Sequence, residues 1–546
     1  MNILKTTSFF TVLLFLTVFG VAKGMPPDSG RALRGINHPE TMHRLVVVND
    51  SLTTLTDSIS LFKNLVEIDF RECPLMDYAD AFNKLAQLPN LRIIDISLSG
   101  LTQLPDNISL LKGLTTINLP YNHLRELPNA LFELPELTSI SLAANPNLNW
   151  QDIFQKLEMA KKLEKLSLAS NNILVVPDEV ALLTSLKSLD LSDNKFTQLP
   201  ASMKNMTELG SIRLNRCPDL DLSKIFKVLS SLPALNEVQL ELCDITDVTG
   251  DIALLNHLSI LDLKGNNLQK LNDAIGKLTG LQKLDLGYQT LGVSQNSIQK
   301  LPSTFSKLTN LQYLDLSGNP IDGFPVGSSE LNSLTTLNLS WCGLTEIPAV
   351  VENFKKLRVL NVSNNNISIF PDWIGTLTSL EELYFDADFF TKRILKLDVL
   401  PAAISQLQNL RILSLRDQVI HGLPDAFCTL KKLRQLDMRN NALEVLPDNF
   451  GDLSSLDSLD LKVNLLTKLP ASFAQLKQLS CLDISLNETL NVDEVFLKLA
   501  QLNSLIYLDV SYTNFNDGQL NNLKASLPQT KIIAKTLDDL KFQPGK

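Results

Sequence analysis

The sequence predicts an α/β solenoid, a coil of stacked turns in which every turn adds one short strand to a long parallel sheet. Leucines recur in the frame LxxLxLxxN from Leu65 to Leu505, in 19 copies spaced by 23, 26 or 30 residues, and a degenerate copy lies around Leu45. Apolar residues alternate within the frame with the period of two that is typical of a strand. Because self-similarity at a fixed period dictates architecture, these copies define one continuous array.

The ninth position of the frame is usually asparagine, as in Asn122 and Asn194. An amide side chain can donate and accept, so we expect it to pair with buried backbone groups of neighbouring turns. Cysteines take the ninth position in four other turns, at Cys73, Cys217, Cys243 and Cys342. We expect buried structural thiols there, although Cys217 and Cys243 lie on adjacent turns and could be tested for a disulfide.

After the ninth position, the chain returns along the outer side of each turn. An apolar residue followed by proline recurs twelve times on this path, from Pro105 to Pro470. Proline fixes φ and lacks an amide hydrogen, so most return paths should be irregular or short 3-10 turns. The 26-residue turns differ, because residues 150–157 and 222–229 carry apolar residues at helical spacing after a polar start. We expect α-helices there, and in the similar turns that open at Leu65 and Leu479.

The 23-residue pattern LxxLxLxxNxLxxLPxxIxxLxx resembles the leucine-rich repeat superfamily in its short LPxxI form, over residues 42–533. The resemblance implies a right-handed leucine-rich repeat solenoid (horseshoe). Such a solenoid has a concave parallel β-sheet and a convex face of irregular, 3-10 and short α-helical segments. The resemblance also implies a protein ligand on the concave face, but it implies no particular one, because the superfamily has no common ligand.

Two turns depart from the template in the same way. Residues 281–310 and 380–409 each hold seven extra residues just past the strand, in loops at about 287–297 and 386–396. Tyrosine, tryptophan and arginine are enriched at binding hot spots, and only 6% of this chain is aromatic. The predicted ligand-binding site therefore comprises the aromatic and basic side chains on or beside these turns: Tyr288, Tyr313, Trp341, Tyr384, Phe389, Phe390, Lys392 and Arg393. The alternative is scattered surface aromatics and loops that pack onto the solenoid.

The fifth frame position is aspartate in ten turns, which places a row of carboxylates on the predicted concave face. Such a row could bind a basic ligand or cations, or it could simply belong to the repeat pattern and be solvated. Calcium needs several carboxylates that converge on one point, so a flat row predicts no metal site. Arg416, Arg439 and Lys462 lie beside two members of the row and should neutralise them locally. The ten are Asp69, Asp95, Asp190, Asp262, Asp285, Asp315, Asp437, Asp460, Asp483 and Asp509.

The N-terminus has the pattern of a secretory signal peptide. Lys5 precedes an apolar stretch at residues 9–21, and small residues follow it. The alternative, an uncleaved membrane anchor, would need ~20 apolar residues. We therefore expect a secreted, periplasmic or cell-surface protein without stable membrane insertion, bacterial in type because no cysteine pairs flank the array. The expected divisions are a signal peptide (1–24), an N-terminal lead-in or cap (25–44), an array of about 20 turns (45–519), a C-terminal capping turn (520–533) and a flexible tail (534–546).

Composition and motifs favour binding over catalysis. The net charge is −10, and it becomes −12 (47 basic against 59 acidic residues) without residues 1–24, which works against nucleic acid and anionic membranes as partners. The sequence has no P-loop, GxSxG or CxxC motif, and its five histidines fall on unrelated turns, so neither a catalytic site nor a cofactor is predicted. We expect a non-catalytic protein that binds a macromolecule, above all a protein. The alternative is an envelope or surface structural protein that acts in adhesion through association of its repeats.

Overall fold

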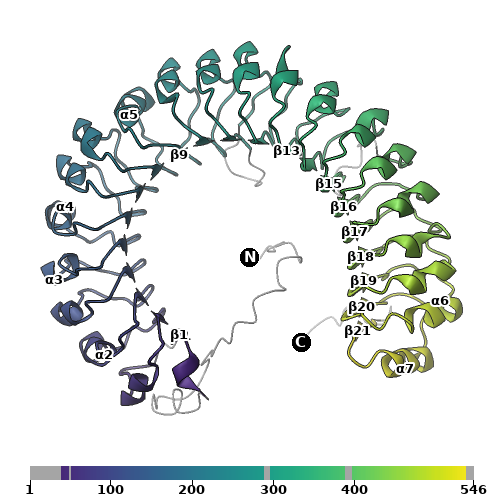
Figure 1. Cartoon of the computed structure of the whole chain (residues 1–546), viewed down its shortest axis with the longest axis horizontal. Helices are drawn as coiled ribbons and strands as arrows, with labels where there is room; N and C mark the ends of the chain where they lie inside the picture. The colour runs from purple at the N-terminus through teal and green to yellow at the C-terminus, as the bar shows by residue number, and fades with distance from the viewer. Residues whose placement is uncertain (1–37, 48–50, 288–295, 388–395, 536–546) are drawn as a thin grey trace, which may run out of the picture. The chain divides into compact units, whose positions relative to one another are not determined.

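A computed structural model describes residues 38–47, 51–287, 296–387 and 396–535. The chain divides into two compact units, Met1–Val238 and Gln239–Lys546, and each is described by itself. Within each unit, short strands line one side and helices line the opposite side, with each turn stacked on the next (Figure 1). The predicted α/β leucine-rich repeat solenoid with a parallel sheet is confirmed.

Every frame of the first unit forms a three-residue strand, parallel to its neighbours. The strands are β1 Arg44–Val46, β2 Glu67–Asp69, β3 Ile93–Asp95, β4 Thr116–Asn118, β5 Ser139–Ser141, β6 Lys165–Ser167, β7 Ser188–Asp190 and β8 Ser211–Arg213. The third, fourth and fifth frame positions supply the three residues, so that Leu45 pairs with Ile68 and Ile68 with Ile94. The fourth-position side chain is buried in each of these strands, as the alternation predicts.

The second unit continues the same pattern. Its strands are β10 Ile260–Asp262, β11 Lys283–Asp285, β12 Tyr313–Asp315, β13 Thr336–Asn338, β14 Val359–Asn361, β15 Glu382–Tyr384, β16 Ile412–Ser414, β17 Gln435–Asp437, β18 Ser458–Asp460, β19 Cys481–Asp483, β20 Tyr507–Asp509 and β21 Lys531–Ile533. Strand β9, Glu237–Gln239, contains the boundary between the units. After the last frame, helix α7 (Asp517–Ser526) leads into β21, which pairs with β20 and extends the sheet by one strand.

The four 26-residue turns carry α-helices, as predicted. They are α2 Tyr78–Leu85, α4 Trp150–Leu157, α5 Leu222–Leu229 and α6 Val492–Leu499. A carboxylate or amide begins three of them, because Asp77, Asn149 and Asp221 each accept the amide hydrogen of the third residue that follows. Most of the shorter return paths are 3-10 turns. An exception is α3, Asn129–Phe132, a four-residue α-helical turn where an irregular or 3-10 path was expected.

Buried asparagines link successive turns, as the ninth frame position predicts. Asn319 has no exposed surface. Its Nδ2 donates to the carbonyls of Leu286 and Leu316, each at 3.0 Å, and its Oδ1 accepts from the amide of Ile298 at 3.0 Å. Leu286 and Ile298 belong to the preceding turn, so one side chain satisfies the backbone of two turns at once.

The four cysteines at this position are buried free thiols, and their predicted burial is confirmed. The Cys342 thiol donates to the carbonyl of Leu316 at 3.2 Å, and the Cys217 thiol donates to that of Leu191 at 3.5 Å. Burial raises the pKa of Cys217 to about 11 and that of Cys342 to about 12. Both thiols therefore stay protonated at neutral pH and act as weak hydrogen-bond donors.

The two seven-residue insertions enter the fold between a strand and the buried polar side chain that follows it. In the first, Asn296 takes the role of the ninth-position asparagine, with Nδ2 donating to Leu263 and Leu286 and Oδ1 accepting from Leu268. The interiors of both loops, 288–295 and 388–395, lie outside the described residues. Among the described helices, none is long and apolar enough to cross a membrane.

Candidate ligand-binding surface

Two of the predicted site residues lie on the sheet surface of the second unit. Tyr313 occupies the third frame position on β12 and Tyr384 the fifth on β15, and both are half-buried. The ammonium of Lys283 lies 4.8 Å from the centre of the Tyr313 ring, and the Tyr384 hydroxyl donates to Glu382 Oε2 at 2.8 Å. Burial, followed by neighbouring carboxylates, raises the pKa of both tyrosines, so they are neutral hydrogen-bonding groups.

Trp341 lies at the edge of the sheet, at the eighth frame position after β13. Its amide donates to the carbonyl of Ser363 in the next turn at 3.0 Å, which fixes the backbone. Its φ is +58°, in the left-handed region, and its side chain is 44% exposed. A bulky side chain in that region strains the backbone. Backbone preference therefore does not explain a tryptophan here, and nearly half of its surface is open to a ligand.

Together these residues outline a surface across four consecutive strands, β12 to β15, which adjacent spacing makes about 14 Å wide. Aromatic rings lie at both ends, and the half-buried side chains of Asn338 and Asn361 lie between them. This aromatic surface, defined by Tyr313, Trp341 and Tyr384, is the described part of the predicted site. The remaining predicted residues, Tyr288, Phe389, Phe390, Lys392 and Arg393, lie outside the described residues.

The first residue of each insertion sits against this surface. Gly287 lies so close to β12 that an added Cβ would clash with the side chains of Asp315 and Ser317, which would have to move to admit it. At the second insertion, Asp386 is 6% exposed and accepts from Arg416 Nε at 2.9 Å and from its NH2 at 2.6 Å. An ion pair between the buried Asp386 carboxylate and the partly exposed Arg416, and the close approach of Gly287 to β12, thus fix where the two loops leave the sheet.

The fifth-position aspartates have a structural role. Asp285 accepts the amide hydrogen of Gly287 at 3.2 Å, and Asp315 accepts that of Ser317 at 2.8 Å. The seventh-position amide donates to this carboxylate within its own turn. The amides at the sixth and eighth positions donate instead to backbone carbonyls of the next turn. Asn338 and Asn361 do the same for their own turns. An oxygen at the fifth position is therefore needed to satisfy a backbone donor.

The expectation that this row is solvated is wrong for three of its members. Asp69, Asp262 and Asp285 are 1%, 8% and 7% exposed. Arg44 and Arg71 lie 3.6 Å and 2.8 Å from the Asp69 carboxylate, and Lys264 lies 3.9 Å from that of Asp262. Burial, then the charges of Asp262 and Asp315, raises the pKa of Asp285 to about 7. Within the described residues, no group of three acidic, histidine or cysteine side chains converges to hold a metal ion.

The expected pairing with the row is confirmed for Arg416 and Arg439, whereas Lys462 donates its backbone amide hydrogen to Asp460. Burial and the charge of Asp437 still raise the pKa of Asp460 to about 7. Arg439 NH2 lies 2.6 Å from Asp437 Oδ2, and its Nε lies 3.3 Å from Asp460 Oδ2. Arg416 also approaches Asp437, at 3.9 Å. Arginines thus alternate with carboxylates over β16 to β18, whereas Asp285 pairs in register with Asp262 and Asp315. Carboxylates thus lie side by side at β10 to β12, beside Tyr313, and again at β18 to β20, where Asp460, Asp483 and Asp509 are in register.

The eighth frame position also indicates exposed residues, which a prediction from single residues did not use. The eighth position adopts a left-handed backbone in most turns, yet several turns fill it with a large apolar side chain in place of glycine or asparagine. The exposed examples are Leu98, Tyr121, Trp341 and Val463. Reading the frame by position would have marked Trp341 as an exposed residue at the sheet edge.

Comparisons with known proteins agree with this architecture. A family model described as a leucine-rich repeat region matches residues 304–396 and 403–526, and a model described as leucine rich repeat matches residues 89–146 and 161–218. The chain belongs to the leucine-rich repeat proteins. A sequence search of curated proteins finds no match.

Solved structures share the fold at low sequence identity. The TLR13–ssRNA13 complex is 22% identical, with a TM-score of 0.64 over 91% of this chain and 71% of that chain. A leucine-rich repeat protein of Leptospira interrogans is 24% identical, with a TM-score of 0.46 over 93% of this chain and 98% of that one. An internalin of Listeria monocytogenes is 22% identical, with a TM-score of 0.42 over 60% and 83% of the respective chains. At such identities the likeness concerns the fold alone.

Proposed function

We propose that this chain binds a protein ligand on the aromatic surface of its second unit, over strands β12 to β15. The observation that carries the proposal is Trp341, which is 44% exposed on a left-handed backbone. Exposed tryptophan and tyrosine are the side chains most enriched at protein-binding hot spots. The half-buried Tyr313 and Tyr384 extend the same surface, and the half-buried Asn338 and Asn361 lie between them.

Charge supports a protein ligand over a nucleic acid. The chain carries a net charge of −10, and Asp262, Asp285 and Asp315 lie in register beside Tyr313. Phosphate binding depends on lysine and arginine, so a surface of this sign repels a nucleic-acid backbone. The similarity to an RNA-bound receptor therefore does not carry its ligand over to this chain. The proposed role is recognition, with no catalytic step.

Replacement of Trp341 by alanine should abolish ligand capture and leave the fold intact. Truncating a hot-spot tryptophan costs at least about 2 kcal/mol of binding free energy, or roughly 30-fold in affinity. Wild-type and variant chains would be immobilised and exposed to an extracellular extract, and the bound proteins would be quantified by mass spectrometry. Circular dichroism should be unchanged, because Trp341 lies outside β13 and is not one of the buried core residues.

Tyr121→Ala is the matched control for that experiment. Tyr121 occupies the same eighth frame position in the first unit, with φ +57° and 61% exposure. The control should capture the same proteins as the wild type. Equal capture by the Trp341 variant, or equal loss with the control, would place the binding site elsewhere.

We further propose that the protein is exported and acts outside the cytoplasm. The charged start, apolar stretch and small residues of positions 1–24 support cleavage close to Gly24. N-terminal sequencing of exported protein should begin near Met25. An intact Met1 on a membrane-bound product would contradict the proposal.

A further inference from the structure

The four α-helices of the 26-residue turns share one eight-residue pattern, and α5 departs from it at two positions. In α2, α4 and α6 the third helical residue is acidic and the seventh is lysine. These pairs are Asp80 with Lys84, Asp152 with Lys156, and Glu494 with Lys498. In α5 the third residue is Lys224 and the seventh is Val228. Helix α5 thus has a positive charge at the third position where the other helices have a negative one, and a short apolar side chain at the seventh position where they have lysine.

The lysine in the three matching helices fills the space between its helix and the preceding turn. The Lys156 ammonium donates to the carbonyl of Leu127 at 2.9 Å and lies 2.7 Å from Asp152. The other two lysines make the same contacts, from Lys84 to the Leu55 carbonyl at 2.6 Å and from Lys498 to the Leu469 carbonyl at 2.6 Å. The equivalent carbonyl beside α5 belongs to Leu199, and Val228 is too short and apolar to reach it as a donor.

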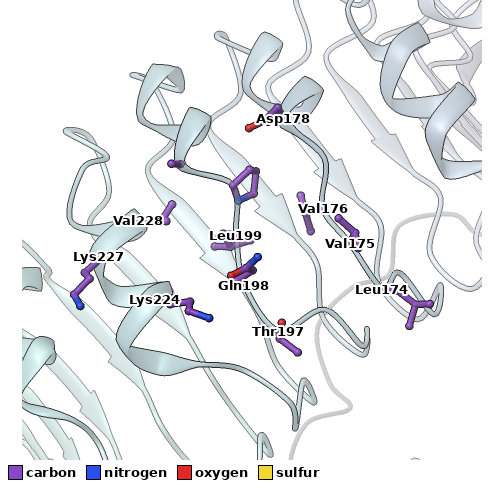
Figure 2. A pocket seen from close by; sticks show the side chains of 12 residues that line it. Leu174, Val175, Val176, Asp178, Thr197, Gln198, Leu199, Lys224, Lys227 and Val228 are labelled. Carbon is purple, nitrogen blue, oxygen red and sulfur yellow. The ribbon is translucent and has the colours of Figure 1, made fainter.

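The space left beside α5 is a groove of about 620 Å³ on the outer face of the first unit (Figure 2). Val176, Leu199 and Val228 line it, and Lys224 and Lys227 of α5 project at one end. A volume of this size is typical of ligand-binding clefts. The groove crosses three consecutive turns of the solenoid, so it suits an elongated ligand.

The opposite end of the groove is apolar, against the pattern of the repeat. Leu174 and Val175 line it and are 68% and 73% exposed. The same two positions of most other turns hold polar pairs, such as Thr197 and Gln198 in the next turn. Where the second residue is apolar, as at Ile369, Val399 and Val445, the first residue is polar. Two adjacent, exposed apolar side chains at positions that are normally polar favour contact with another molecule over core packing.

We propose that this groove binds an acidic, apolar peptide segment of a partner protein. A carboxylate of the segment pairs with Lys224 and Lys227, and an apolar side chain packs between Val175 and Val228. The hydroxyl of Thr197 and the amide of Gln198 lie between the two ends and can bond to the peptide backbone. Lys224 already lies 3.2 Å from Asp221, with 61% of its side chain exposed, so its ammonium remains accessible to a second carboxylate. The groove is separate from the aromatic surface of the second unit, and this proposal does not depend on ligand binding there.

The double variant Lys224→Asp/Val228→Lys tests the proposal, because it gives α5 the acid and lysine of α4. The variant should fold, since Asp152 and Lys156 already make this arrangement in the same chain. The probe is a fluorescent peptide, acetyl-Leu-Glu-Glu-Leu-Phe-amide, with a glutamine version as the neutral analogue. The dissociation constants would be measured by fluorescence anisotropy. On the wild type, the acidic peptide should bind at least 10-fold more tightly than the neutral analogue. The acidic peptide should also bind the wild type at least 10-fold more tightly than it binds the variant.

A second pair of variants tests whether the peptide binds the apolar end of the groove specifically or binds any exposed apolar side chain. Leu174→Thr/Val175→Gln copies the next turn and should weaken binding of the acidic peptide at least 10-fold. Ile369→Gln is the matched control, because Ile369 occupies the position of Val175 in another turn and is 76% exposed. Unchanged binding by the groove variants, an equal loss with Ile369→Gln, or equally tight binding of decanoate to the groove would overturn the proposal.

Discussion

Replacement of Asn319 by alanine should be among the most damaging single changes in the second unit. The change removes donors to the Leu286 and Leu316 carbonyls and an acceptor for the Ile298 amide, all within a side chain that has no exposed surface. The Ile298 amide is left without a partner, which costs about 1–3 kcal/mol, whereas the Leu286 carbonyl still accepts from Asn296 Nδ2 and the Leu316 carbonyl from the backbone amide at position 319. The two other lost hydrogen bonds cost about 0.5–1.5 kcal/mol each, so we expect a loss of roughly 2–6 kcal/mol in the free energy of unfolding. Urea unfolding, followed by circular dichroism, measures it.

Asn310→Ala is the control for that prediction. Asn310 also donates from its Nδ2 to a carbonyl of the preceding turn, that of Thr279 at 2.9 Å, but it is exposed. Water replaces a lost hydrogen bond at an exposed site, so the control should cost less than about 1 kcal/mol. Similar losses for the two variants would contradict the view that buried asparagines hold successive turns together.

Replacement of Asp285 by asparagine should stabilise the protein at pH 8 and have little effect at pH 4. The asparagine oxygen can still accept the Gly287 amide, as Asn338 accepts that of Ser340 at 3.1 Å. The substitution removes a buried charge between Asp262 and Asp315. Since one pKa unit corresponds to about 1.4 kcal/mol, ionisation of Asp285 in the folded state costs about 4 kcal/mol.

The sign of this pH dependence follows from the two pKa values of Asp285. Its pKa is about 7 in the folded state and about 3.9 in an unfolded chain. The folded state therefore binds more protons between these values, so stability falls as pH rises from about 4 to 7 and stays low above pH 7. Urea unfolding at pH 4 and pH 8 should show a gain for the variant at pH 8 only.

Asp190→Asn is the matched control for the pH experiment. Asp190 occupies the same frame position and accepts the Ser192 amide at 3.0 Å, but its neighbours in register are Ser167 and Arg213. Without adjacent carboxylates, its replacement should give no comparable gain at pH 8. A pH-independent effect of Asp285→Asn, or an equal gain from the control, would contradict the assigned cause.

The sequence was sufficient to predict the architecture because the repeat period constrains it at every turn. The alternation of apolar residues predicted the strands, and the ninth frame position predicted that Asn319 is buried and bonds to the backbone of a neighbouring turn. The extra length of the 26-residue turns, with their helical spacing of apolar residues, predicted helices such as α4 and α5. The expectation that the fifth-position aspartates are solvated was wrong for Asp262 and Asp285. A frame position shows which way a side chain points, but the neighbouring side chains, such as Lys264 beside Asp262, decide how much water reaches it.

Prediction of the candidate sites from the sequence was less complete. The aromatic grouping correctly marked Tyr313 and Tyr384 as strand residues, and Trp341 as one beside a strand. It could not show that Trp341 has a left-handed backbone, which depends on how the chain turns after β13. The groove beside α5 was also missed, although an alignment of the four helices would have exposed Lys224 and Val228 as exceptions. Its volume depends on a contact between turns, which a one-turn pattern does not contain.

The most direct test of the proposed binding surface is hydroxyl-radical footprinting of the chain, alone and with its captured protein ligand. Trp341 is 44% exposed and Tyr121 is 61% exposed, so both should be oxidised in the free chain. The account predicts that the ligand slows oxidation of Trp341 severalfold and leaves that of Tyr121 unchanged. Unchanged oxidation of Trp341 in the complex, or protection of Tyr121 in its place, would contradict a ligand-binding surface over β12 to β15.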